Sequence, residues 1–182
     1  MFEDIKTETQ RKKLLSSLTI QVDTREKVGK NDHILNFFDK KEISWVKKKL
    51  DFGDYAPLIP KNEELGIPED ISFADKIMVE RKANLEEISK NLCQDNGRIY
   101  RELASAPLRK VLLIENASYT DLVNGKYDTK FAPKAFWAAL LSMWHKYDIP
   151  IFFMPDKKYS GQFIYGYFYY YLNNVLKGNI EP

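Results

Sequence analysis

The sequence predicts an α/β fold in which helices flank a central mixed β-sheet. Apolar stretches of strand length occur at 18–23, 76–82, 110–116 and 149–154, and segments with apolar residues at helical spacing separate most of them. The last two of these strands are apolar at nearly every position, which is typical of strands that helices cover on both faces. Strands that alternate with helices favour one sheet between two helical layers.

Length and composition indicate one globular domain. The 182 residues are 44% hydrophobic and 30% charged, which suffices for one domain with a sizeable core and is too little for two comfortable ones. Leu14 and Leu15 stand among charged residues near the N-terminus, so we expect residues 1–17 to form an N-terminal arm or helix. Residues 18–182 are then expected to form the single domain.

The first half of the chain shows three further patterns after the strand at 18–23. The segment "NDHILNFFDKKE" (31–42) has apolar residues at helical spacing behind a polar cap, and it predicts a helix. The segment "ISWVKKKLDFGDYAPLI" (43–59) predicts two strands joined by a hairpin-type turn near Asp51–Gly53. Residues 60–75 are polar and contain two prolines, so we expect a loop insert there.

The second half of the chain alternates strands with helices in a regular order. We expect a strand at 76–82, a helix at 84–92, a loop at 95–97 before a short helix, a strand at 110–116, a helix at 133–148, a strand at 149–154 and a helix at 160–178. Pro133 suits the first turn of its helix because no N–H donor is needed there. Gly178 suits the end of the last helix because glycine readily adopts the left-handed conformation.

Composition also excludes several kinds of site. The net charge is only +2, so any surface for nucleic acid must be a local patch. The single cysteine, Cys93, and two histidines exclude an intramolecular disulfide, a cysteine-based zinc cluster and an HxxxH metalloprotease helix. The N-terminus lacks the apolar core of a signal peptide, and no apolar run approaches membrane-spanning length. We therefore expect an intracellular protein that does not associate with membranes.

The strand at 76–82 separates its charged side chains by face. Side chains alternate along a strand, so we expect two sets: Met78, Glu80 and Lys82 on one face, and Ile77, Val79 and Arg81 on the other. Asp54, beside a glycine on a neighbouring predicted strand, completes the pattern D…ExK. Two converging carboxylates repel each other, and a hard cation such as Mg²⁺ removes the conflict. A lysine beside metal-bound water suits phosphodiester hydrolysis, although a solvated strand end with a surface ion pair would explain the same residues.

Four motifs in a fixed order carry a family resemblance. They are "VDTREK" (22–27), "FGDY" (52–55), "VERKANLEE" (79–87) and "GRIYREL" (97–103). With them the chain resembles the XPF family of structure-specific endonucleases, a branch of the PD-(D/E)XK nucleases. The resemblance implies a restriction-endonuclease-like fold. We see no appended helix–hairpin–helix modules, so DNA binding is expected from the nuclease domain itself, a dimer partner or another protein.

The resemblance also implies roles for individual residues. Asp54 and Glu80 would bind Mg²⁺ or Mn²⁺, with the backbone carbonyl of Arg81 as a third ligand, and Lys82 would assist the attacking water. Asp23, at the edge of the site, would be the fourth catalytic residue. The supporting positions would be Arg25 and Glu26 as organising or DNA-contacting residues, and Arg81 and Arg98 as supports of the site or of phosphate. The family has an aspartate where this chain has Glu86, whose role is therefore open.

The function that the resemblance implies is metal-dependent endonucleolytic cleavage of branched, flap or fork DNA in repair, recombination or replication. A Holliday-junction resolvase or a restriction-type nuclease is an alternative, and a non-catalytic DNA-binding or scaffold subunit is another. The family dimerises through its C-terminal helical region, so we expect a homodimer there, with Trp137, Met143 and Trp144 contributing. A phage or mobile-element protein acting in the cytoplasm or nucleoid of a host cell is compatible with these features.

Five lysines follow one another closely in the segment "DKKEISWVKKKLD" (39–51). Most of them are expected to lie on a solvated strand edge. One or two could follow the DNA backbone, because a few phosphate contacts supply most non-specific affinity. The sequence does not distinguish which.

Overall fold

The structure is a computed structural model that describes residues 2, 5, 7–26, 29–94, 98–106 and 109–182. Within these residues a seven-stranded sheet has the order β2-β1-β3-β5-β6-β7, and the short β4 pairs with β3. The strands are β1 (Thr19–Asp23), β2 (Trp45–Lys48), β3 (Tyr55–Ile59), β4 (Ile71–Ser72), β5 (Ile77–Lys82), β6 (Arg109–Glu115) and β7 (Ile151–Met154). The predicted mixed sheet is confirmed.

One antiparallel strand in the middle of the sheet sets its geometry. β3 runs antiparallel to β1 and β5, whereas β1 is parallel to β2, and β5 is parallel to β6 and β6 to β7. It follows that β1, β2, β5, β6 and β7 all end at the same edge of the sheet, where β3 begins. Residues at these ends can meet although they are far apart in sequence.

The predicted hairpin at 43–59 is wrong. β2 and β3 are separated by β1, because Gln21 is paired with Val46 of β2 on one side and with Ala56 of β3 on the other. The chain does reverse near Asp51–Gly53, but it crosses over the end of β1 before it enters β3. Turn residues indicate that the chain reverses direction, but they do not indicate which strand will pair with the strand that follows the turn.

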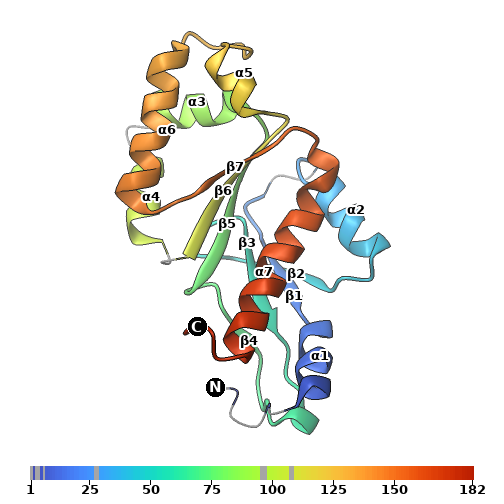
Figure 1. The fold of residues 1–182 in the computed structure, drawn as a ribbon. Helices are drawn as coiled ribbons and strands as arrows, with labels where there is room; N and C mark the ends of the chain where they lie inside the picture. The colour runs from blue at the N-terminus through green and yellow to red at the C-terminus, as the bar shows by residue number, and fades with distance from the viewer. Residues whose placement is uncertain (1, 3–4, 6, 27–28, 95–97, 107–108) are drawn as a thin grey trace.

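Two layers of helices cover the two faces of the sheet (Figure 1). One layer contains α1 (Glu8–Ser16), α2 (Asp32–Lys40) and α7 (Ser160–Leu176), and the other contains α3 (Leu85–Gln94), α4 (Arg98–Ser105), α5 (Tyr119–Val123) and α6 (Pro133–Tyr147). Alternate side chains of the same strand enter different cores, as Val79 packs with the α7 layer and Met78 with the α6 layer. The sheet therefore lies between two separate apolar cores.

The segment 60–75 is more ordered than a loop insert. It forms the 3₁₀ helix η1 (Glu63–Leu65) and β4, and its apolar residues Leu65, Ile67 and Phe73 are buried in the core. The prolines and charges of this segment leave no regular spacing of apolar residues in the sequence. Leu65, Ile67 and Phe73 are buried because the fold brings them to the same core. The sequence analysis also missed α5, which Ser118 and Asp121 stabilise with a capping box, and η2 (Lys157–Tyr159).

The other helices agree with the predicted ranges. Leu14 and Leu15 of α1 are buried, so the N-terminal segment includes a helix that packs on the domain. Met143, which we expected at a dimer interface, is buried in the core, and that part of the expectation is wrong. No helix among the described residues is long and apolar enough to cross a membrane.

A close contact between α2 and α7 yields a testable consequence. A Cβ atom at Gly161 would lie only 2.7 Å from Cδ1 of Phe37, whereas a Cβ at Gly166 would meet nothing within 4 Å. We expect Gly161→Ala to lower the free energy of unfolding by about 1–3 kcal/mol, because the half-buried ring of Phe37, which packs against the core, must move. Gly166→Ala, in the same helix, should raise it by about 0.5–1 kcal/mol. Urea unfolding of both variants measures the difference, and equal effects would contradict the close packing.

Candidate active site

A cavity of about 230 Å³ opens where the parallel strands end. The ends of β1 and β5, the loop before β3, and helices α3 and α4 contribute its lining. The lining residues are Asp23, Arg25, Glu26, Asp51, Phe52, Gly53, Asp54, Met78, Glu80, Lys82, Asn91, Ile99, Glu102 and Leu103. The three residues of the predicted D…ExK pattern all belong to this set.

Backbone hydrogen bonds fix Asp54 between two strands. Its N–H donates to the carbonyl of Val79 at 2.9 Å, and its carbonyl accepts from the N–H of Asp23 at 2.9 Å. Its carboxylate oxygen Oδ2 accepts from the backbone N–H of Arg81 at 2.7 Å. One carboxylate oxygen is therefore held by β5, and the position of the other is fixed as a consequence.

Gly53 allows this arrangement. It has a φ of +68°, a conformation in which side chains are strained. A Cβ there would also lie 2.7 Å from Sδ of Met78 and 3.1 Å from the carbonyl oxygen of Val79. The glycine of "FGDY" thus lets the loop pass close to β5 and bring Asp54 beside Glu80.

Glu80 and Lys82 share the cavity face of β5, as the strand period predicts. Nζ of Lys82 donates to Oε1 of Glu80 at 2.6 Å, and both side chains are largely buried. Burial disfavours the charge on Lys82, but the negative charges of Glu80 and Asp54 outweigh it, so the pKa of Lys82 is raised above its usual value. Lys82 is therefore a cation that can orient an oxygen ligand, and it does not serve as a base at neutral pH.

The negative charge of Asp54 is electrostatically unfavourable in this cavity. Burial, together with the negative charges of Glu80 and Glu26, raises the pKa of Asp54 well above its usual value, although Lys82 opposes this. A divalent cation between the carboxylates would remove the repulsion. Among the described residues no group of three histidine, cysteine, aspartate or glutamate side chains forms a complete metal cage. Two carboxylates fit Mg²⁺ or Mn²⁺, because such ions keep waters and bind substrate phosphate as further ligands.

Arg81 lies on the opposite face of β5, away from the cavity. Its side chain is only 3% exposed, and its Nη2 lies 2.8 Å from Oε2 of the fully buried Glu115. The same nitrogen donates to the carbonyl of Lys30 at 2.9 Å, and Nε2 of His33 lies 2.7 Å from Oε1 of Glu115. The guanidinium thus anchors β5 to β6 and α2, while the backbone N–H of the same residue holds Asp54.

Asp23, Arg25 and Glu26 form one rim of the cavity. Asp23 is buried and accepts hydrogen bonds from Arg25, including one from Nε at 2.7 Å. Arg25 also donates to the carbonyl of Leu50 at 2.7 Å, which ties the rim to the loop before β3. Burial raises the pKa of Glu26, and nearby Arg81 opposes this.

One of the expected supporting residues, Glu86, lies outside the cavity. Glu86 accepts a hydrogen bond from the backbone N–H of Asp128 at 2.9 Å and does not line the cavity. Its neighbour Glu87 accepts from the N–H of Ala83 at 2.7 Å. Burial would raise the pKa of Glu87, but this hydrogen bond and nearby cations, including Lys82, lower it. The side chain of Arg98 lies outside the described residues.

Three polar cavity residues were not predicted from the sequence, namely Asp51 in the loop before β3, Asn91 and Glu102. Asn91 and Glu102 reach the cavity from α3 and α4. Glu102 belongs to the motif "GRIYREL", in which a role was assigned only to Arg98. Glu102 lies four residues after Arg98, on the same face of the predicted helix, and this spacing could have identified it as a site residue.

Comparisons with known proteins give the family and the fold. A family model described as the ERCC4 domain matches residues 22–167. A solved structure of XPF from Aeropyrum pernix is similar, with a TM-score of 0.58 and 18% identity over 88% of this chain and 68% of that one. A structure of XPF from Aeropyrum pernix in complex with DNA has a TM-score of 0.57 and 19% identity, covering 90% and 67% of the two chains. No curated protein matches the chain.

Breaking the buried pair of Arg81 and Glu115 should be strongly destabilising, because the remaining charge would be buried without a partner. Removing one partner of a buried ion pair typically costs about 3–5 kcal/mol, and we expect that loss in urea unfolding of Glu115→Gln at neutral pH. Burial raises the pKa of Glu115, but the hydrogen bond from His33 and the charge of Arg81 lower it below its usual value of 4.5. The stability from this group is therefore present above pH 4.5 and is lost as the pH falls further.

The difference between Glu115→Gln and the wild type should accordingly shrink in acid. Glu69→Gln, at an exposed position, is the matched control and should change the free energy of unfolding by less than about 0.5 kcal/mol. A loss under 1 kcal/mol for Glu115→Gln would contradict the expectation that Arg81 is left as an uncompensated buried charge.

Proposed function

The chain belongs to the ERCC4 domain family, and on this basis we propose that it is a metal-dependent endonuclease that hydrolyses phosphodiester bonds in branched, flap or fork DNA. The observation that carries the proposal is the convergence of Asp54, Glu80 and Lys82 in one cavity at the sheet edge. Repair, recombination or replication inside a cell would supply such substrates.

Asp54 and Glu80 would hold Mg²⁺ or Mn²⁺, with the backbone carbonyl of Arg81 as a further ligand. The bound cation would lower the pKa of a coordinated water and stabilise charge on the phosphate. Arg81 N–H orients Asp54, and the Lys82 cation would orient the attacking water or a phosphate oxygen. Because the pKa of Asp54 is raised, the cation must displace a proton at low pH, so cleavage should increase with pH through that range.

The alternatives differ in what they ask of the cavity. A non-catalytic scaffold subunit does not need two repelling carboxylates beside a buried lysine. Such an arrangement lowers the stability of the fold, so selection for stability without catalysis would replace it. This observation favours an enzyme. A Holliday-junction resolvase or a restriction-type nuclease would use the same cavity, and the choice of DNA structure distinguishes them. The XPF structure bound to DNA supports DNA as the ligand of this fold.

We also propose a homodimer through the C-terminal helical region. Exposed aromatic side chains support it, namely Phe152 on the edge strand β7 and Tyr170 on α7, which are 44% and 65% exposed. Trp137 on α6 is 36% exposed, but α6 and α7 cover opposite faces of the sheet (Figure 1). Sedimentation velocity should give a species of twice the chain mass, and a stable monomer at micromolar concentration would exclude the dimer.

Cleavage assays test the central proposal. Labelled single-stranded, duplex, flap, fork and four-way-junction DNA are incubated with Mg²⁺ or Mn²⁺, or with EDTA. We expect cleavage of a branched substrate that EDTA abolishes, and a fall of about 100-fold or more for Asp54→Asn and Glu80→Gln, because each variant removes a charge that the cation requires. Glu69→Gln should cleave like the wild type. Equal cleavage by all four proteins would indicate a contaminant and refute the assignment.

A thermal shift provides a readout that does not depend on activity. Without metal, Asp54→Asn should be slightly more stable than the wild type, by about 1 kcal/mol, because it removes the repulsion with Glu80. At a metal concentration 100 times its Kd, the wild type should gain about 2.7 kcal/mol, and Asp54→Asn and Glu80→Gln should gain far less. Equal gains in all three proteins would place the metal elsewhere.

A further inference from the structure

The cavity is strongly acidic for a site that would receive DNA. Eight ionisable residues line it: the carboxylates of Asp23, Glu26, Asp51, Asp54, Glu80 and Glu102, and the cations of Arg25 and Lys82. Both cations are already engaged, since Arg25 pairs with Asp23 and Lys82 with Glu80. A phosphate backbone is repelled by this balance of charge. Attraction must come from bound metal and from cations just outside the cavity.

The register of β1 with β2 brings one lysine to that boundary. Asp23 is paired in parallel with Lys48, and Val22 with Lys47. Paired residues of parallel strands point to the same face, and neighbouring strands lie about 4.8 Å apart. Lys48 therefore follows Asp23 directly along the sheet, one strand beyond the cavity.

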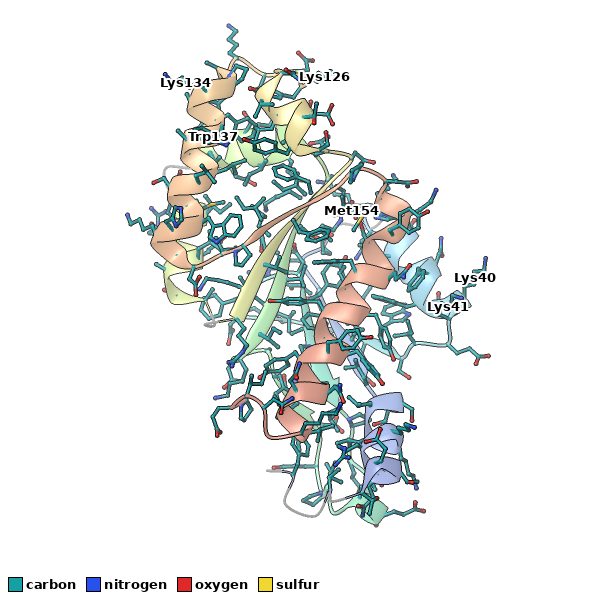
Figure 2. The ribbon with its side chains drawn as sticks, in the orientation of Figure 1. Lys40, Lys41, Lys126, Lys134, Trp137 and Met154 are labelled. Carbon is teal, nitrogen blue, oxygen red and sulfur yellow. The ribbon has the colours of Figure 1, made fainter. Side chains whose placement is uncertain are left out.

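Packing confirms which face each lysine occupies. Val22 and Trp45 pack into the core under α2 and α7, whereas Asp23 lines the cavity on the other face. Alternation along β2 then directs Lys47 to the α2 side with Trp45, and Lys48 to the cavity side with Asp23. Lys40 at the end of α2 and Lys41 directly after it lie on the opposite side of the molecule from Lys134 and Trp137 of α6 (Figure 2).

Lys48 is also available to bind an anion. It is exposed, and within the described residues no carboxylate forms a salt bridge with it. By contrast, Arg25 is restrained by Asp23 and by the carbonyl of Leu50. Lys48 therefore meets three conditions: its side chain is exposed, it forms no salt bridge within the described residues, and it lies on the same face of the sheet as the cavity.

We propose that Lys48 binds the DNA phosphate backbone beside the scissile bond, so that the cleaved strand crosses the ends of β5, β1 and β2 towards the β2 edge of the sheet. The proposal rests on the proposed endonuclease function and adds the path of the strand across this site. Lysines on an edge strand also prevent edge-to-edge association, a role that Lys47 and Lys48 would serve equally. The two explanations therefore differ in whether the two lysines are equivalent.

Fluorescence anisotropy with a labelled fork DNA distinguishes them. All proteins carry Glu80→Gln to prevent cleavage, and binding is measured between about 50 and 300 mM KCl. Loss of one phosphate contact should reduce the slope of log K against log salt by about 0.7–0.9 and weaken binding by up to about tenfold at 100 mM salt. We expect this for Lys48→Ala, a retained slope for Lys48→Arg, and a slope equal to that of the parent for the matched control Lys47→Ala.

The outcomes separate this proposal from the one on which it rests. If the wild type cleaves DNA but Lys48→Ala keeps the parental slope, the Lys48 contact is refuted and the endonuclease function stands. Equal reductions for Lys47→Ala and Lys48→Ala would also refute it, because the effect would then come from edge charge in general. If the wild type neither binds nor cleaves DNA, both proposals fall.

Discussion

The buried ion pair between Arg81 and Glu115 is the interaction on which the geometry of the site depends. The pair joins β5 to β6 within a core that water does not reach, and His33 of α2 completes it. The backbone N–H of Arg81 points the other way and holds the carboxylate of Asp54. One residue thus connects a structural network on one face of the sheet with the candidate catalytic residues on the other, and its neighbours Glu80 and Lys82 take their places as a consequence.

Such an anchor is required because the cavity is electrostatically unfavourable by itself. Asp54 and Glu80 repel each other in a place where burial already disfavours charge. Lys82 compensates only in part, since its ammonium is bound to Glu80. A site that holds like charges together must draw the stability for this from elsewhere, and in this chain the two apolar cores supply it, while the Arg81–Glu115 pair fixes the position of β5. A cation and a phosphate would complete the charge balance that the protein leaves open.

The antiparallel strand β3 has a consequence for chemistry as well as for topology. Since β3 begins where its neighbours end, the residue before it, Asp54, lies beside the last residues of β5. The left-handed conformation of Gly53 brings the chain close enough for this contact. The same edge of the sheet places Lys48 next to Asp23 through the parallel register of β1 and β2. A single sheet edge thus carries the candidate metal ligands and the candidate DNA contact in one line.

The sequence by itself determined most of the helices and strands, the faces of Glu80, Arg81 and Lys82, and the motif in which Asp54 follows Gly53. These features depend on the period of a strand, the spacing of apolar residues and local turn chemistry, all of which act over a few residues.

The tertiary structure alone decided which strands are neighbours, and with them the contacts of the site. It placed β1 between β2 and β3 where a hairpin was expected, paired Arg81 with Glu115, turned Glu86 towards Asp128, and set Lys48 beside Asp23. Each of these depends on which distant segments share a core and a hydrogen-bonded ladder. That choice is made by the burial of the whole chain, and no local pattern records it.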